Sequence, residues 1–155
     1  MDRETRATVD DHRALRLWLR LLTCSQLIER HVRSRLRERF GITLPRFDLM
    51  SQLERHPQGL KMNELSRLLM VTGGNVTGVV DQLVKEGLVE RVDDAADRRA
   101  WRVRLTRAGD KAFAEMARAH EQWVVALLAG LSRKDADALM QLLARLKRTT
   151  LENSA

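Results

Sequence analysis

The apolar residues in the first quarter of the chain recur at helical spacing. No Pro or Gly occurs between Asp10 and about Arg39, so this segment is predicted to form one long helix. Its apolar stripe and the residues that widen it are Leu15, Trp18, Leu22, Leu27, Ile28, Val32 and Leu36, with Leu17, Leu19 and Leu21. An apolar face this wide exceeds what one small domain can cover, which predicts packing against a second copy of the chain.

Two shorter helices are predicted next. Gly41 breaks the pattern, Thr43 is placed to cap a helix with Pro45 in its first turn, and that helix ends before Pro57. The stretch LKMNELSRLLM predicts a further helix, with an apolar face formed by Leu65, Leu68 and Leu69. The stretch VTGG then separates this helix from the next pattern by a tight turn.

A third short helix and a hairpin follow. The helix is expected from about Gly74 to Glu86, and Gly87 is a good residue to end it. Its inward face is predicted to consist of Val76, Val79, Val80 and Leu83. The period then changes to two in LVERV and WRVRL, which predicts two strands joined by the charged loop DDAADRRA. One side of WRVRL is expected to pack, while its arginines meet water or an anion.

Two long helices are predicted to close the chain. Thr106 is placed to cap the first, and Ser132 with Asp135 has the spacing of a capping box for the second. Their apolar residues are Phe113, Met116, Trp123, Val124, Leu127 and Leu128, then Leu139, Leu142, Leu143 and Leu146. No repeat or linker divides the sequence, so residues 1–155 are predicted to form a single domain.

The composition and net charge of the chain predict a kind of binding partner and a cellular compartment. The 155 residues are 44% hydrophobic, and 28 Lys+Arg against 21 Asp+Glu give a formal net charge of +7. This excess favours a polyanionic partner such as nucleic acid or an acidic surface. The charged N-terminus lacks the apolar core of a signal peptide, and the longest uncharged run, Leu68 to Val80, is too short to span a bilayer. We therefore expect a soluble, cytoplasmic protein that binds no membrane.

The patterns that would indicate catalysis are weak. Gly73 and Gly78 have the glycine spacing of a phosphate loop, but Val79 and Val80 stand where Lys and then Ser or Thr are needed. No nucleophile and base, and no pair of carboxylates, can be matched from sequence order. We predict that the protein is not an enzyme and holds no cofactor.

The single cysteine, Cys24, excludes an internal disulfide and fits a reducing cytosol. Together with His31 on the same helix it supplies too few ligands for a metal site. Free cysteine behaves mainly as a small apolar residue, so a buried structural role is expected, with redox sensing as the alternative.

The order of elements is that of a winged helix-turn-helix, in which the second helix of the motif enters the major groove of DNA. The predicted fold is mainly α with a small β-hairpin wing. Residues 43–106 would form the DNA-binding region, flanked by the long dimerisation helices at 10–40 and 107–150. On this interpretation the stretch TGGNVT, Thr72 to Thr77, is the N-terminal turn of the recognition helix.

Small residues at this turn let the backbone approach phosphates, which the helix dipole attracts. The candidate DNA contacts there are Gly73, Gly74, Asn75, Thr77 and Gly78. Asn75 and Thr77 suit base edges or phosphates, although a capping network within the turn would use the same residue types. Gly78 marks close contact with DNA or a neighbouring helix, or a merely permissive surface position.

The stretch NVTGVVDQLVKEGLVER followed by DRRAWRVRLTRAG resembles the recognition helix and wing of MarR-type transcriptional regulators. The similarity extends over nearly the whole chain, because the first helix and the two closing helices resemble the dimerisation region of that family. The wing signature is specific, and its residues are Asp97, Arg98 and Arg99, then Leu105, Thr106 and Gly109.

The resemblance implies roles for the wing residues. Arg99 would reach the minor groove, which attracts arginine where it is narrow, and Asp97 would help to hold it, whereas a solvated turn with a local ion pair is the alternative. The sequence departs from the family at Gly78, where an arginine is common. One DNA contact in each half-site is then either missing or supplied by Arg67 or Lys85.

The resemblance also implies a homodimer that binds a palindromic operator in double-stranded DNA. Many members release DNA when a small aromatic acid, its CoA thioester or an oxidant acts where the dimerisation and reader regions meet. The absence of tyrosine lowers the expectation of redox sensing. An apolar pocket with a cation suits an aromatic carboxylate, and its expected lining is Trp18, Leu22, Ser25, Arg46, Met50 and Trp123.

The alternative role of Trp18 and Leu22 is to pack in the core of the dimer. The sequence thus predicts a ligand-responsive regulator, more specifically a repressor. A protein-binding winged helix without specific DNA binding, and a cysteine-based redox regulator, are the alternatives.

Overall fold

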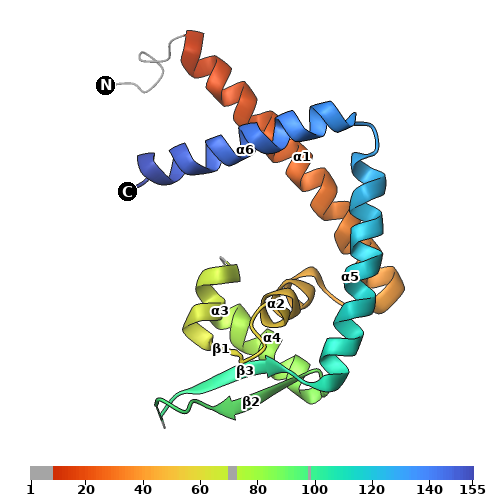
Figure 1. Cartoon of the computed structure of the whole chain (residues 1–155), viewed down its shortest axis with the longest axis vertical. Coiled ribbons are helices and arrows are strands. Elements are labelled where there is room, and N and C mark those ends of the chain that lie inside the picture. Colours follow the sequence, from red (N-terminus) through yellow and green to blue (C-terminus); the bar gives the residue numbers. More distant parts are fainter. Residues whose placement is uncertain (1–8, 70–72, 98) are drawn as a thin grey trace. The chain divides into compact units, whose positions relative to one another are not determined.

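The computed structural model describes residues 9–69, 73–97 and 99–155. Within them the elements follow in the predicted order, with one strand added (Figure 1). They are α1 (Val9–Phe40), α2 (Leu44–Glu54), β1 (Leu60–Lys61), α3 (Met62–Leu69), α4 (Gly73–Lys85), β2 (Val89–Asp93), β3 (Trp101–Leu105), α5 (Arg107–Leu128) and α6 (Arg133–Asn153). The predicted fold class, mainly α with a small β-hairpin wing, is confirmed.

The chain divides into two compact units, residues 1–121 and residues 122–155. In the first unit α2, α3 and α4 pack on one another, α2 also contacts β3, and α4 contacts β2. The largest fully buried side chains come from these elements and from the end of α1, and they are Leu36, Leu49, Met50, Leu53, Leu65, Val76, Val80, Leu83 and Val103. Burying an aliphatic side chain of this size contributes about 1.5–3 kcal/mol, so this core holds the helix-turn-helix together.

The start of α5 is fixed to α2 by aromatic packing. Phe47 of α2 lies against Phe113, with ring centroids 5.5 Å apart, and against the ring of His120, at 4.9 Å. Burial lowers the pKa of His120, because an apolar environment disfavours the charged imidazolium. The apolar periodicity predicted Phe113 in the core, and its ring is buried.

The sheet has the strand order β1-β3-β2, and both pairings are antiparallel. Leu60 of β1 and Arg91 of β2 both pair with Val103, the fully buried centre of β3. The sequence placed Leu60 and Lys61 at the start of a helix. That prediction was wrong, because a two-residue strand is too short to show a period of two.

The hydroxyl group of Thr106 connects the end of α4, the hairpin and the start of α5 through hydrogen bonds. Gly87 ends α4 with φ +75°, a conformation that favours glycine. Thr106 Oγ1 donates to the Gly87 carbonyl at 2.7 Å and accepts from the Gly109 backbone N–H at 3.0 Å. The predicted capping role of Thr106 is therefore confirmed. Gly109 lies so close to the Leu88 carbonyl that a Cβ there would overlap with it.

Three local predictions need correction. Leu68, expected on the inner face of α3, is 44% exposed, because α3 is only two turns long and buries Leu65 alone. Thr43 stands at the N-cap of α2 but makes no side-chain capping bond. Trp101 lies on the same side of β3 as Val103 yet is 37% exposed, since the hairpin extends beyond the core at that end.

The second unit holds the end of α5 and the helix α6. The Ser132 side chain accepts from the Asp135 backbone N–H at 3.1 Å, as the predicted cap requires. No residue of α6 is buried, so the leucines of its apolar stripe are exposed in the single chain, and they are Leu139, Leu142, Leu143, Leu146 and Leu151. None of the described helices is long and apolar enough to cross a membrane.

Replacing Gly109 with Ala is expected to destabilise the first unit. The added Cβ meets the Leu88 carbonyl, so backbone must shift, and overpacking of this kind costs about 1–3 kcal/mol. Urea unfolding measures the loss. Gly130→Ala is the matched control, because nothing lies within 4 Å of a Cβ at that position. Equal stability of the two variants would contradict the close packing at Gly109.

Candidate nucleic-acid interface and adjoining cavity

The helix α4 buries one face and exposes the other. Val76 and Val80 are buried, whereas Asn75, Thr77 and Gly78 are exposed. Gly73 and Gly74 are its first two residues. Among the described atoms nothing lies within 4 Å of a Cβ built on Gly78, so no neighbouring helix of this chain requires glycine there. The interpretations left for Gly78 are a partner outside the chain and a permissive position.

The electrostatics of the N-terminal end of α4 favour an anion. A helix N-terminus carries a partial positive charge from its unpaired backbone N–H groups. The first turn of α4 holds no acidic residue that would oppose this charge. Arg67, in the last turn of α3, and Lys85, in the last turn of α4, are both exposed. Each remains available as the cation that the sequence lacks at Gly78.

The tip of the hairpin is ordered by Asp97. Its Oδ1 accepts the Arg99 backbone N–H at 2.9 Å, and its carbonyl accepts the Ala100 N–H at 3.1 Å. Asp97 and Arg99 are exposed. The contact between Asp97 and Arg99 in the structure is therefore a bond to the Arg99 backbone N–H. Arg98, the third predicted wing residue, lies outside the described residues.

Asp94 at the base of the hairpin is a buried carboxylate that the sequence analysis missed. Its Oδ1 accepts the Ala96 N–H at 2.9 Å, and its Oδ2 lies 3.3 Å from Lys61 Nζ and 3.4 Å from Arg102 Nε. The Ala96 bond, with the two cations, holds the pKa of Asp94 below its ordinary value even though burial opposes this. The alternation of charge in WRVRL was the available signal, because Arg102 needs a nearby anion.

Further ion pairs connect the hairpin internally and to α4. Arg104 pairs with Glu90 of β2, with 2.7 Å between Nε and Oε1. Arg91 of β2 pairs with Asp81 of α4, and its guanidinium lies 4.9 Å from the centre of the Trp101 ring. An exposed pair of this kind contributes under about 1 kcal/mol, and the cation–π contact adds a similar amount. Together they modestly favour this position of the wing relative to α4.

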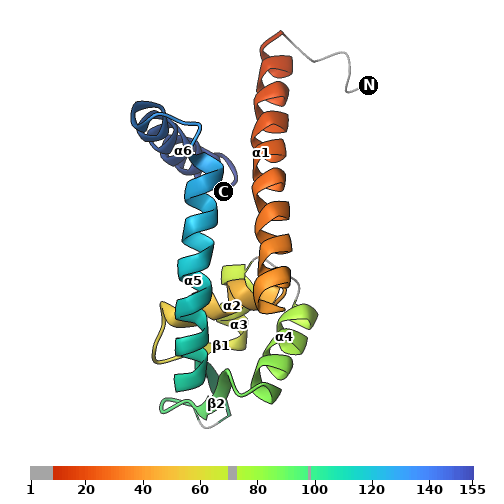
Figure 2. The same cartoon turned by 90° about the vertical axis from the view of Figure 1, so that its right-hand side faces the viewer.

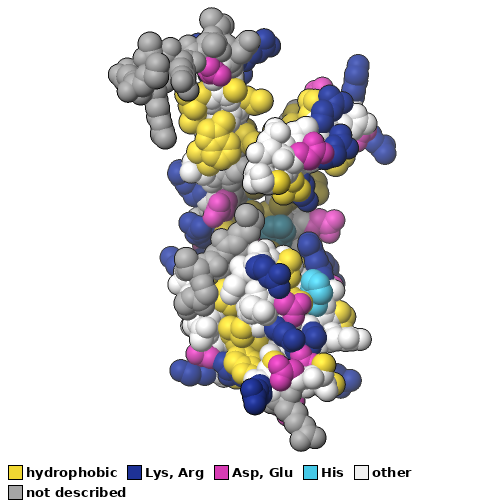
Figure 3. Space-filling view, turned by 90° about the vertical axis from the view of Figure 1, so that its left-hand side faces the viewer, with side chains coloured by type: hydrophobic (Ala, Val, Ile, Leu, Met, Phe, Trp, Pro, Cys, Tyr) yellow, Lys and Arg dark blue, Asp and Glu magenta, His cyan; other side chains and the backbone are white. Residues whose placement is uncertain are grey.

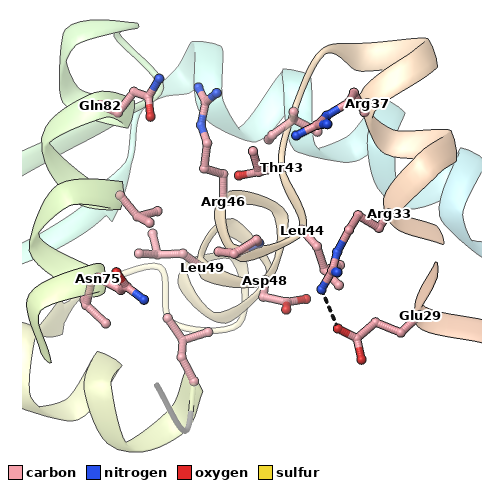
Figure 4. Close-up of a pocket in the computed structure, with 15 residues that line it drawn as sticks. Glu29, Arg33, Arg37, Thr43, Leu44, Arg46, Asp48, Leu49, Asn75 and Gln82 are labelled. Carbon is pink, nitrogen blue, oxygen red and sulfur yellow. Dashed lines mark hydrogen bonds and ion pairs between the residues drawn. The ribbon is translucent and has the colours of Figure 1, made fainter. Parts of the chain in front are cut away.

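A cavity of about 640 Å³ lies behind α4, within the first unit. Figure 2 shows the ribbons of the helices α1 to α4 of this unit, and Figure 4 shows the side chains that line the cavity. Its walls are the C-terminal half of α1, the start of α2, the last residue of α3 and the inner side of α4. The lining residues are Glu29, Arg33, Arg37, Ile42, Thr43, Leu44, Pro45, Arg46, Asp48, Leu49, Leu69, Asn75, Val76, Val79 and Gln82.

The charged side chains that line the cavity differ in the partners that they have. Arg33 pairs with Glu29 at 2.7 Å. Arg46, only 8% exposed, pairs with Glu86 just beyond the end of α4, while its buried Nε has no hydrogen-bond partner among the residues that the structure describes. Burial, and then the charge of Glu29, raise the pKa of Asp48. Leaving a buried guanidinium N–H unsatisfied is costly.

Only Arg46 of the six predicted effector-pocket residues lines this cavity. Met50 is fully buried in the core, Trp18 is 52% exposed on α1, and Leu22 is half-buried. The Ser25 hydroxyl donates to the Leu21 carbonyl at 2.9 Å. Trp123 belongs to the second unit.

The structure bears on the predicted role of Cys24 and on metal binding. Cys24 is exposed on α1, so the expectation of a buried cysteine is wrong for the single chain. The wide apolar face of α1 contains more residues than the chain itself covers, which explains the difference. Within the described ranges no group of three or more His, Cys, Asp or Glu residues is placed to hold a metal ion.

Comparison with known proteins agrees with this geometry. A model of the MarR family matches residues 40–100, from the end of α1 to the wing. The transcriptional activatory protein BadR of Rhodopseudomonas palustris is 32% identical over 98 residues, which cover 62% of this chain and 55% of that protein. The chain therefore spans about half the length of this relative.

The similar solved structures cover most of the chain. A MarR family transcriptional regulator from Silicibacter pomeroyi is 32% identical with a TM-score of 0.79, and the match covers 93% of this chain and 99% of that one. A mutant of MarR from E. coli, complexed with operator DNA, is 22% identical with a TM-score of 0.76, and the match covers 90% of this chain and 99% of that one. Sco3205 from Streptomyces coelicolor, in complex with DNA, is 21% identical with a TM-score of 0.76, and the match covers 92% of this chain and 89% of that one.

A helix-turn-helix followed by a two-stranded wing, with long helices before and after it, defines a winged-helix regulator of transcription. The chain belongs to the MarR family of transcriptional regulators. Since the family and the relatives are regulators of transcription, the prediction that the chain is not an enzyme is confirmed.

Replacing Asp94 with Asn is expected to destabilise the protein in a pH-dependent manner. The lowered pKa means that the ionised carboxylate stabilises the folded state above about pH 4, where the unfolded chain is also ionised. This stabilisation is lost as the pH falls through the folded pKa. Urea unfolding should therefore show a gap between wild type and Asp94→Asn near neutral pH that closes on acidification.

Asp137→Asn on α6 is the matched control, because it removes an exposed carboxylate outside the hairpin. A gap for Asp94→Asn that stays constant with pH would show that its carboxylate does not act through charge.

Proposed function

We propose that the protein is a homodimeric, ligand-responsive transcriptional regulator that binds double-stranded DNA at a palindromic operator. The observation that carries this proposal is the exposed N-terminal half of α4, with Asn75, Thr77 and Gly78, beside a wing that Arg91 ties to the same helix. The net charge of +7 suits a polyanion. Two proteins of the same fold, the MarR mutant and Sco3205, were solved with DNA.

In this proposal α4 enters the major groove. Asn75 pairs with a base edge, Thr77 contacts a base or a phosphate, and the backbone at Gly73, Gly74 and Gly78 approaches the phosphates. The wing reaches the adjacent minor groove with Arg99, while Asp97 fixes the turn through the Arg99 backbone N–H at 2.9 Å. Arg98 adds a charge at the same tip.

The support for dimerisation is the apolar surface that the single chain leaves uncovered. Figure 3 shows hydrophobic side chains gathered on the N-terminal half of α1. The exposed large residues of α1, α5 and α6 include Leu15, Leu17, Trp18, Leu19, Leu27, Val125, Leu127, Leu139, Met140 and Leu142. Large apolar side chains exposed along a helix favour an interface. A symmetric dimer presents two copies of α4 to half-sites about one helical turn of DNA apart.

The response is proposed to come from a small aromatic acid or its CoA thioester, which releases a repressor from DNA. Its support is the MarR membership and a cavity whose walls combine apolar and cationic side chains. BadR is named as an activatory protein. A reporter gene placed behind the selected operator distinguishes the two signs of control, since repression predicts higher expression when the regulator is absent.

Arg99→Ala is expected to weaken binding to all DNA sequences and to reduce the salt slope by about one unit per wing. Asn75→Ala should instead lose sequence preference, by about 1–3 kcal/mol per contact. Both effects are measured by a salt series of binding to a pool of genomic fragments, with sequencing of the retained DNA.

Arg133→Ala and Asn153→Ala on α6 are the matched controls for charge and amide loss. Unchanged binding in both test variants would overturn the assignment of the DNA-contacting residues. Weak binding with no selected palindrome would favour a protein-binding winged helix instead.

Leu142→Glu is expected to convert the dimer to monomers. Leu142 is exposed on α6 in the single chain, and a twofold interface meets the buried charge twice. Sedimentation over a concentration series should give a dissociation constant at least about tenfold weaker. Gln141→Glu adds the same charge at the neighbouring exposed position and should remain dimeric. A monomeric wild type would contradict the proposal.

A further inference from the structure

The exposed face of α4 carries little positive charge for a surface proposed to meet DNA. The charged side chains of this helix are those of Asp81 and Lys85, and Lys85 lies in its last turn. Asp81 follows Gly78 by three positions, so the two residues are neighbours on the helix surface. A carboxylate at this place repels DNA phosphates unless a cation accompanies it, and no residue of α4 before Lys85 supplies one.

The cation beside Asp81 comes from the hairpin. Nη2 of Arg91 in β2 pairs with Asp81 Oδ1, and the guanidinium also lies 4.9 Å from the centre of the Trp101 ring. In the sheet Arg91 pairs with Val103, and Trp101 stands two residues before Val103 on the same face of β3. Two contacts, one from α4 and one from β3, therefore place the guanidinium between the wing and the exposed face of α4.

Arg91 keeps hydrogen-bond donors for a further anion. A guanidinium has five N–H donors, and among the described residues the one hydrogen bond of Arg91 goes from Nη2 to Asp81. The side chains of Arg91 and Asp81 are 36% and 52% exposed, so a DNA backbone can reach them. The planar fork of arginine can bind a phosphate oxygen while it keeps a carboxylate on its other side.

Gly78 leaves room for an anion next to Asp81. Among the described atoms nothing lies within 4 Å of a Cβ built on Gly78, so a DNA phosphate can approach the helix there. A second carboxylate on this face of the hairpin is that of Asp93, which is exposed opposite Trp101. It lies two residues beyond Arg91, about 7 Å further along β2, so it opposes a phosphate near the wing tip more than one near Gly78.

We propose that Arg91 contacts a DNA phosphate beside Gly78, and that Asp81 and Trp101 hold its guanidinium in place for this contact. This inference rests on the proposed DNA-binding function. A phosphate contact adds affinity and fixes the register of the protein on the duplex, but it carries no sequence preference. Arg91 therefore positions α4 in the groove, and the choice of sequence is left to the polar residues of α4.

The test measures DNA binding by the full-length protein in a salt series. Arg91→Gln should bind all sequences more weakly and reduce the salt slope by about 0.9 for each half-site, while the sequence retained from a pool of genomic fragments stays the same. Because this change also leaves Asp81 without its cation, it is repeated in an Asp81→Asn background, where the slope should fall as well. Arg104→Gln is the matched control, because Arg104 forms an exposed pair with Glu90 on the opposite face of the hairpin, and it should keep the wild-type slope.

Gly78→Arg provides a rescue that a merely structural role of Arg91 does not predict. The new guanidinium can reach the same phosphate, so it should raise the affinity of Arg91→Gln by about fivefold or more and that of wild type by less than about twofold, because neighbours that share one partner are not additive. In a Lys85→Gln variant the gain from Gly78→Arg should be as small as in wild type.

Three results would overturn the inference: a wild-type salt slope for Arg91→Gln, an unchanged slope when the same change is made in Asp81→Asn, or an equal gain from Gly78→Arg in wild type and in Arg91→Gln. Rescue of Lys85→Gln in place of Arg91→Gln would assign the phosphate to Lys85. Failure of the wild type to bind DNA rejects the proposed function and this contact with it, whereas wild-type binding with unaffected Arg91 variants rejects the contact alone.

Discussion

The packing of α4 against α2 and the sheet is the constraint from which the candidate DNA surface follows. Val76, Val80 and Leu83 are buried against a core that includes Leu49 and Val103. Because side chains on a helix repeat every 3.6 residues, burying this stripe leaves Thr77 and Gly78 exposed, and Asn75 exposed at the edge that also lines the cavity. The polar residues are therefore oriented by the burial of the apolar stripe, and this orientation requires no interaction made by the polar side chains themselves.

Charged pairs then connect elements that the core alone would leave loosely joined. Asp94 with Lys61 and Arg102 holds the base of the wing, Arg91 with Asp81 joins the wing to α4, and Arg46 with Glu86 joins α4 to α2. In a chain with a net charge of +7, each carboxylate in these pairs has several cations as possible partners. The pairs that form are those whose backbone positions the sheet and the helices have already fixed.

The elements were predictable from the sequence because their signals are local. Helical periodicity located α1 and α4 to within about one residue at each end, and the change to a period of two located β2 and β3. Signals that depend on distant residues were not available. The burial of Asp94 requires Lys61, 33 positions away in the sequence, and the cavity has walls from four helices. Cys24 was misjudged because an apolar helical face does not reveal whether its own chain or a partner covers it.

Gly78 carries a consequence for how the protein can change over evolutionary time. A glycine within a helix costs about 1 kcal/mol relative to Ala, and no described neighbour in the chain restricts the space at this position. Almost any side chain can therefore be introduced at the centre of the exposed face of α4 without repacking the core. Under the proposed DNA-binding role, a single substitution at this position changes the surface that α4 offers to an operator and leaves the scaffold intact.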